Sequence, residues 1–220
     1  MYLLPLGKYL IEHIDEILHK EILNTDQITL LPLVKEFKRS YNLVGGTAIA
    51  LQIGHRRSID FDLFKLTPIN HKQILSKIST LNARPIITRR VDDQLNLILQ
   101  GVKFTFFEYP FDVPATIKFE DVLKMPNLLD LAAMKAYALG RRSKWKDYVD
   151  LFFILSNHFT IKEISERSTE IFGDLFSEKQ FRAQLCYFND IDFEEKVDYL
   201  VKAPSEKDIK KLLSKMAVEF

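Results

Sequence analysis

Two carboxylates spaced two residues apart are the most chemically informative feature of this sequence. Asp60 and Asp62 alternate with Phe61 and Leu63 in the segment 58–66, a pattern typical of a β-strand. Because side chains at i and i+2 lie on one face of a strand, the carboxylates project together, about 6–7 Å apart. Their mutual repulsion would be relieved by Mg²⁺ (or Mn²⁺), which also bridges phosphate oxygens. The pair predicts a metal site for phosphoryl chemistry; a solvated strand face is the simpler alternative.

A glycine pair precedes these carboxylates. Gly45 and Gly46 follow the short apolar segment 42–44 and open an expected helix that ends near Gly54. Without Cβ atoms the backbone can approach a phosphate closely, and Thr47 adds a hydroxyl at the positive end of the helix dipole. A glycine pair alone usually marks a turn. Followed thirteen residues later by the carboxylate pair, it is typical of phosphoryl or nucleotidyl transfer.

A lysine lies inside an apolar helical stripe further along the chain. Residues 128–141 have helical spacing, and Lys135 lies four residues after Leu131 and four before Leu139. A lysine in this position must extend its amine to solvent, pair with a carboxylate or contact a bound anion. Extension to solvent is the simplest of the three outcomes.

Two more carboxylates lie three residues apart on the next expected helix, 144–155. Asp147 is near the start of this helix, where an acidic residue compensates the helix dipole. Asp150 lies between Val149 and Leu151, where that explanation suits it less well. We therefore favour Asp150 over Asp147 as the functional residue.

These motifs resemble those of a known family. The segment GGTAIALQIGHRRSIDFDLF (45–64) resembles the first motif of the AbiEii/AbiGii abortive-infection toxins, nucleotidyltransferases of the DNA polymerase β-like superfamily. The segment DLAAMKAYALGRRSKWKDYVDLFFIL (130–155) resembles the downstream lysine and Arg/Lys-Asp-x-x-Asp-Leu motifs of that family. The resemblance covers about residues 40–156.

The resemblance implies a Mg²⁺-dependent enzyme that transfers a nucleoside monophosphate from an NTP to an acceptor hydroxyl. It also implies tRNA or another RNA as the acceptor, a toxin–antitoxin or phage-defence system, and a cognate antitoxin as partner. The implied catalytic residues are Asp60, Asp62, Lys135, Asp147 and Asp150, with Asp60 and Asp62 as the metal ligands. The implied nucleotide-binding residues are Gly45, Gly46, Thr47, Arg57, Ser58 and Lys135.

One departure from the superfamily pattern supports an alternative. A third carboxylate is expected on the strand 102–108, where Thr105 takes its position and Glu108 is out of register. Asp150, in the helical half of the chain, is the candidate to replace this third carboxylate. A catalytically impaired nucleotide-binding or regulatory protein of the same fold is therefore the alternative function. A nucleic-acid adaptor that uses the basic run 141–146 is a third hypothesis.

The elements that position these residues predict an α/β (α+β) fold. Helical and strand patterns mix in the first half, including a helix around residues 6–14, strands at 85–90, 94–99 and 102–109, and a helix at 70–81. After residue 127 every pattern is helical. We expect a nucleotidyltransferase-like mixed sheet flanked by helices in a domain 1–115, followed by a helical domain 116–220. Ile59 and Phe61 are expected to be buried against helices.

Composition excludes several classes of protein. With 220 residues, 47% hydrophobic and 28% charged, the chain has the usage of a globular protein. The net charge of +1 gives no general signal for nucleic-acid binding. The one cysteine, Cys186, excludes an intramolecular disulfide and is expected to be a buried hydrophobe. No apolar run approaches the ~20 residues that cross a bilayer, so we expect a cytoplasmic protein without a membrane partner.

Overall fold

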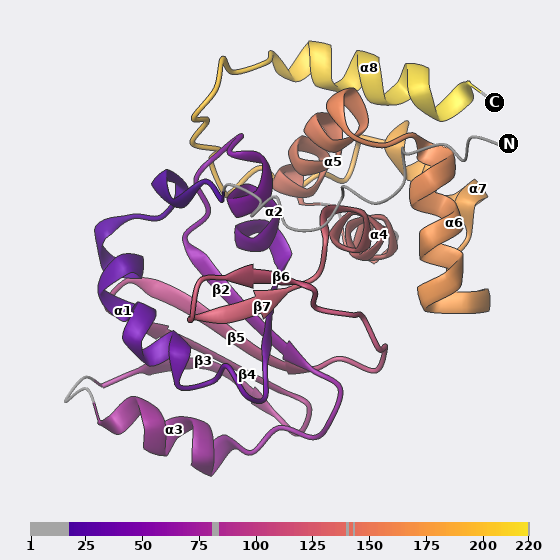
Figure 1. Ribbon diagram of the computed structural model, residues 1–220. Coiled ribbons are helices and arrows are strands. Elements are labelled where there is room, and N and C mark those ends of the chain that lie inside the picture. The colour runs from indigo at the N-terminus through magenta and orange to yellow at the C-terminus, as the bar shows by residue number, and fades with distance from the viewer. Residues whose placement is uncertain (1–17, 81–83, 140, 143, 220) are drawn as a thin grey trace, which may run out of the picture.

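The computed structural model of the protein describes residues 18–80, 84–139, 141–142 and 144–219 (Figure 1). The helix expected around residues 6–14 lies outside this range. The described chain forms a mixed sheet of seven strands in the order β3-β4-β5-β2-β1-β7-β6. The strands are β1 (Asn42–Val44), β2 (Asp60–Lys65), β3 (Ile86–Val91), β4 (Gln94–Leu99), β5 (Val102–Glu108), β6 (Ile117–Phe119) and β7 (Leu123–Met125).

Helices lie on both sides of this sheet (Figure 1). The helices are α1 (Thr25–Lys35), α2 (Gly45–Ile53), α3 (His71–Ser79), α4 (Leu128–Leu139), α5 (Trp145–Asn157), α6 (Ile161–Phe172), α7 (Glu178–Leu185) and α8 (Glu206–Val218), with 3₁₀ turns at Lys20–Ile22 and Gly173–Leu175. Helices α1 and α3 lie on one face, and α2, α4 and α5 gather on the other (Figure 1). The α/β class and the mixed sheet confirm the expected fold.

The central strands alternate between a buried face and a half-buried face. On β5, Phe104 and Phe106 are fully buried, and Phe106 packs edge-on against Phe37, which follows α1, with ring centroids 4.9 Å apart. On β2, Phe61 is fully buried and packs against Phe104. The residues between them point to the opposite face, which carries Asp62 and its neighbours. The apolar face therefore fixes which way the carboxylates project.

The expected helical domain 116–220 begins with two strands, β6 and β7. They form a hairpin within residues 117–125 and join the sheet beside β1, so helices dominate only from Leu128 onward. Strands of three residues are too short to show a period of two, which is why the pattern missed them. The division of the chain into domains 1–115 and 116–220 stays a prediction.

Two burial predictions were wrong. Ile59 is 46% exposed because β2 begins one residue later, at Asp60, so Ile59 belongs to the preceding loop. Cys186 is exposed because it follows the last residue of α7 rather than lying on the buried side of that helix. In the described part of the chain, no helix is both long and apolar enough to span a bilayer.

Candidate active site

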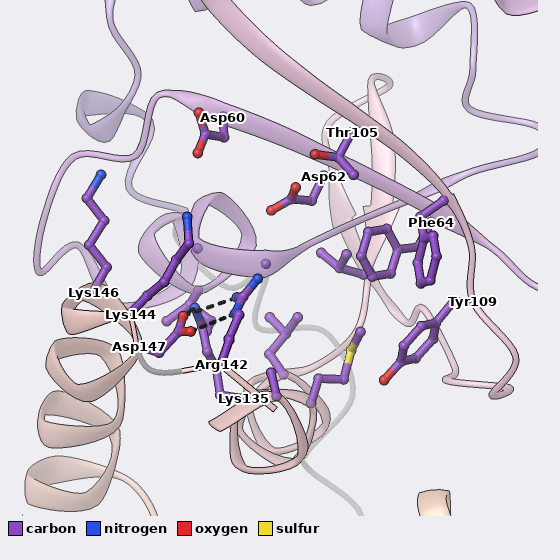
Figure 2. Close-up of a pocket in the computed structure, with 18 of the residues that line it drawn as sticks. Asp60, Asp62, Phe64, Thr105, Tyr109, Lys135, Arg142, Lys144, Lys146 and Asp147 are labelled. Carbon is purple, nitrogen blue, oxygen red and sulfur yellow. Dashed lines mark hydrogen bonds and ion pairs between the residues drawn. The ribbon is translucent and has the colours of Figure 1, made fainter. Parts of the chain in front are cut away.

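A cavity of about 560 Å³ opens between the sheet and the helices α2, α4 and α5. Strands β2, β4 and β5 form its floor, and the start of α2 forms one wall. Asp60, Asp62 and Thr105 lie on one side of this cavity, with Arg142 and Lys144 opposite them (Figure 2). The cavity is therefore the place where the residues singled out in the sequence meet.

The carboxylate pair is half-buried on the cavity face of β2. Burial, followed by the charge of Asp62, raises the pKa of Asp60 above its ordinary value. Burial also raises the pKa of Asp62, although a hydrogen bond from Thr105 and the charge of Arg142 lower it in part. Both shifts show that the negative charges are poorly compensated by the protein, and a cation between them would remove this cost.

The donor set suits a hard divalent cation. Within the described ranges, no group of three or more His, Cys, Asp or Glu side chains could hold a metal ion. Mg²⁺ needs fewer protein ligands, because it usually binds one or two carboxylates and takes its remaining oxygens from water and substrate phosphates. Asp60 and Asp62 fit Mg²⁺ or Mn²⁺ on this basis.

Strand register determines the neighbours of the two carboxylates. Strands β2 and β5 are parallel, with Asp60 opposite Lys103 and Asp62 opposite Thr105. Glu108 lies opposite Lys65 at the far end of the strand pair and does not line the cavity. The β5 position beside Asp62 is thus held by a hydroxyl rather than by a third carboxylate.

The two glycines at the start of α2 make room for charged groups of the protein itself. Gly45 has φ +73°, and a Cβ atom there would lie 2.2 Å from Oδ2 of Asp62. A Cβ atom on Gly46 would lie 2.6 Å from Nη2 of Arg56. In this structure the glycine pair therefore allows Asp62 and Arg56 to approach the helix start.

Thr47 and Ser58 differ in their relation to the cavity. The Thr47 side chain is buried, and its hydroxyl donates to the backbone carbonyl of Asp60 and lies 2.9 Å from the Ser58 hydroxyl. Thr47 does not line the cavity, and its hydroxyl holds the start of β2; its contact with a phosphate stays a prediction. Ser58 does line the cavity.

Asp150 lies at the centre of a buried network of charges. It is fully buried and accepts two hydrogen bonds from Arg56, at 2.7 and 2.9 Å, and one from Nε2 of His55 at 2.8 Å. The amine of Lys135 pairs with Oδ2 of Asp150 at 2.9 Å. Burial raises the pKa of Asp150, but Arg56 and Lys135 outweigh it and hold the pKa well below its usual value. Asp150 cannot replace the missing third carboxylate, because its oxygens are already committed to these cations.

Lys135 pairs with carboxylates rather than extending to solvent. Its amine lies between Asp147 and Asp150, and the side chain is 6% exposed. Asp147 also accepts a hydrogen bond from Arg142 at 2.9 Å (Figure 2). Lys135, Arg142 and Asp147 all border the cavity, so this ion-pair cluster forms its wall opposite the carboxylate pair.

Of the expected nucleotide-binding residues, Arg57 faces away from the cavity. It pairs with Asp198 at 3.2 Å and donates to the backbone carbonyl of Glu21. Arg56 lines the cavity in its place. The segment 198–200 pairs with the loop before β2, where the amide of Arg57 donates to the carbonyl of Asp198. This backbone pairing holds Arg57 on the side of the loop away from the cavity.

Further cavity residues were missed by sequence reasoning. Lys103 lies two residues before Thr105, so strand alternation alone would have placed it on the cavity face. Glu195 gave no sequence signal; it pairs with Lys144 and Lys146 at 3.0 Å each. In the described lining, cations outnumber carboxylates: Arg56, Lys103, Lys135, Arg141, Arg142, Lys144 and Lys146 against Asp60, Asp62, Asp147 and Glu195. The cavity therefore favours an anionic ligand.

The fold is that of a nucleotidyltransferase. MenT4, a nucleotidyltransferase toxin from Mycobacterium tuberculosis H37Rv, aligns with a TM-score of 0.60 and 12% identity over 87% of this chain and 81% of its own. JHP933 from Helicobacter pylori aligns with a TM-score of 0.53 and 15% identity over 91% of each chain.

Sequence comparison defines the family. The chain belongs to the nucleotidyl transferase AbiEii toxin family of type IV toxin–antitoxin systems, whose profile matches residues 34–219. The resemblance seen in the motifs is confirmed. A protein of Aquifex aeolicus (strain VF5) is 34% identical over an alignment of 131 residues that covers 57% of this chain. The match spans 63% of the length of that relative.

Proposed function

We propose that this protein transfers a nucleoside monophosphate from an NTP to an acceptor hydroxyl, and that the acceptor is an RNA such as tRNA. The observation that carries the proposal is the pair Asp60 and Asp62, aligned on β2 in a cavity whose other charged lining residues are mostly cationic. Two carboxylates amid cations suit a metal–triphosphate complex, in which the substrate carries both negative charge and a divalent cation.

The metal would be held by Asp60 and Asp62. When bound, Mg²⁺ or Mn²⁺ would neutralise phosphate charge and polarise the phosphoryl group under attack. Gly45 and Gly46 lie on the cavity wall at the positive end of α2, where an anion such as a phosphate is favoured.

The cationic side chains would bind and orient the triphosphate. Lys103, Lys144 and Lys146 are half-buried around the carboxylate pair and are suited to contact phosphate oxygens. Lys144 and Lys146 also pair with Glu195. Lys135 and Arg142 border the same space and pair with Asp147. We assign Asp147 and Asp150 the role of positioning Lys135, and assign Lys135 a role in binding phosphate.

A cognate antitoxin and a cytoplasmic location are part of this proposal. The family supports the antitoxin, since the family is defined by a toxin–antitoxin system. NTPs and RNA are both found in the cytoplasm, which is consistent with the substrates proposed.

The second candidate is a nucleotide-binding or regulatory protein that has lost catalysis. The presence of Thr105 beside Asp62, where the superfamily pattern places a carboxylate, is the observation that favours it. Such a protein would bind the NTP without transferring any part of it.

Incubation with α-³²P-labelled NTPs, total RNA and Mg²⁺ tests the proposal. We expect labelled RNA with the wild-type protein, none with Asp62→Asn, and undiminished labelling with Asp92→Asn, a change in an exposed carboxylate of the turn between β3 and β4. Binding of NTP without labelling of any RNA would favour the second candidate. Labelling that is unaffected by Asp62→Asn would overturn the assigned site.

A further inference from the structure

Aromatic side chains form one end of the cavity. We call Phe64, Phe107, Tyr109, Phe111 and Tyr137 the aromatic wall; all five line the cavity. Adjacent ring centroids along this series are 5.1–6.1 Å apart, so the rings form a continuous surface from the sheet to α4. Phe64 and Tyr109 lie at the opposite end of the cavity from Lys146 (Figure 2). One end of the cavity therefore carries Lys146 and its neighbouring cations and the other the aromatic rings, where the guanidinium of Arg141 lies 3.5 Å from the centroid of Tyr137.

Strand register shows how the two ends are connected. The row that contains Asp62 continues through Thr105 to Asn96, and the next row contains Phe64, Phe107 and Gln94. Rows two residues apart are separated by about 6–7 Å. The aromatic wall thus begins one step along β2 from the carboxylate pair, on the same face of the sheet.

Polar groups accompany the aromatic wall. Burial raises the pKa of the Tyr109 phenol, and its hydroxyl has no hydrogen-bond partner in the part of the chain that is described. Tyr109 as a whole is half-buried and lines the cavity, so its hydroxyl is available to a ligand there. The Gln94 and Asn96 side chains are joined by one hydrogen bond of 2.9 Å, and both amides line the cavity. These three groups can form hydrogen bonds with a planar ligand held against the rings.

We propose that the aromatic wall binds the base of the nucleotide, and that Tyr109, Gln94 and Asn96 select among bases. This inference rests on the proposed function, because it takes the triphosphate to lie at the carboxylate pair. A nucleotide has an anionic end and an aromatic end joined by a ribose, and the cavity has the same polarity. Aromatic side chains stack on any base, whereas hydrogen bonds to the base edge distinguish one base from another.

Binding measurements test the wall without requiring catalysis. We expect Phe107→Ala to raise the Kd for the preferred NTP about tenfold or more, since stacking on one base contributes about this much. The Kd for inorganic tripolyphosphate, which has no base, should stay within about twofold. Tyr187→Ala, which removes an exposed ring outside the cavity, should change neither Kd. Thermal melting would check that each variant folds.

The polar groups are tested by variants of nearly the same shape. Tyr109→Phe and Gln94→Leu should each change the ratio of Kd values among the four NTPs by about fivefold to tenfold, again without changing the Kd for tripolyphosphate. Because Tyr109→Phe keeps the ring, it is expected to fold even if Phe107→Ala does not.

The outcomes separate this inference from the proposed function. A wild-type protein whose NTP binding depends on the wall, but that labels no RNA, would overturn the proposed function and leave the wall in place. Equal weakening of NTP and tripolyphosphate binding would overturn the wall as a base site. Unchanged NTP binding with a raised KM for the RNA would instead assign the wall to the acceptor and would also overturn the inference.

Discussion

Without a bound cation, the half-buried carboxylates of Asp60 and Asp62 make the folded protein less stable than a neutral side chain at one of these positions would. Their raised pKa values mean that the folded protein retains these protons to a higher pH than the unfolded chain does. As pH rises from the ordinary carboxyl range through the raised pKa values, the free energy of unfolding therefore falls. A bound divalent cation should restore this loss.

A neutral substitution should expose this effect. At pH 7 without divalent cations we expect Asp60→Asn to raise Tm by about 2–4 °C, which corresponds to ~1 kcal/mol for a chain of this size, because it removes the repulsion. At a pH below the ordinary carboxyl range the two proteins should melt alike. Mg²⁺ should raise the Tm of the wild type more than that of the variant. Calorimetry measures all three comparisons, and an unfolded variant would mark the pair as structural.

Among the elements, the turn from β1 into α2 depends most on one residue type. Gly45 combines a left-handed backbone with a close approach to Asp62. Gly101 has φ +80°, but no described atom lies within 4 Å of the place that a Cβ atom would take there. The two glycines share the backbone requirement and differ in what surrounds them. They form a matched pair for mutation.

Substitution of this pair separates backbone strain from displacement of the carboxylate. Gly101→Ala should cost about 1–2 kcal/mol, the cost of a left-handed conformation. Gly45→Ala should cost more than this, since its Cβ must push Asp62 aside, and should also abolish the rise in Tm with Mg²⁺. Urea denaturation and thermal shifts measure both effects. Equal losses in the two variants, with the Mg²⁺ response intact, would show that Gly45 serves only the backbone.

In the whole molecule, Asp150 joins the sheet to the helical half. Its partners His55 and Arg56 come from the loop between α2 and β2, and Lys135 comes from α4. Burial lowers the pKa of His55 although Asp150 raises it, so His55 is neutral at pH 7 and donates its Nε2 proton. Removing the charge of Asp150 would leave the buried guanidinium of Arg56 without its salt-bridge partner and Lys135 with Asp147 alone.

We expect Asp150→Asn to lower the free energy of unfolding by about 3–5 kcal/mol at pH 7. Glu166→Gln, which breaks an exposed pair with Lys162, should change it by less than ~0.5 kcal/mol. Because the pKa of Asp150 is lowered on folding, its contribution is present above the ordinary carboxyl pKa and is lost as pH falls below it. The difference in stability between wild type and variant should therefore narrow as pH falls below the ordinary carboxyl pKa. Urea denaturation from pH 7 to pH 3 measures this, and a constant difference would contradict the assignment.

The predicted features that agree with the structure depend on neighbours within a few residues. The shared face of Asp60 and Asp62 follows from the period of a strand, and the start of α2 follows from the glycine pair. The apolar surroundings of Lys135 correctly limited it to a few outcomes, one of which is the observed pairing with Asp147 and Asp150. These inferences needed only local geometry.

Tertiary structure decided what depends on distant segments. The segment 198–200 turned Arg57 away from the cavity, and the register of β5 placed Lys103 and Thr105 beside the carboxylates. The approach of α5 to the loop before β2 committed Asp150 to Arg56. A sequence determines the face on which a side chain lies through local periodicity, but its partner depends on packing between elements that are far apart in the chain.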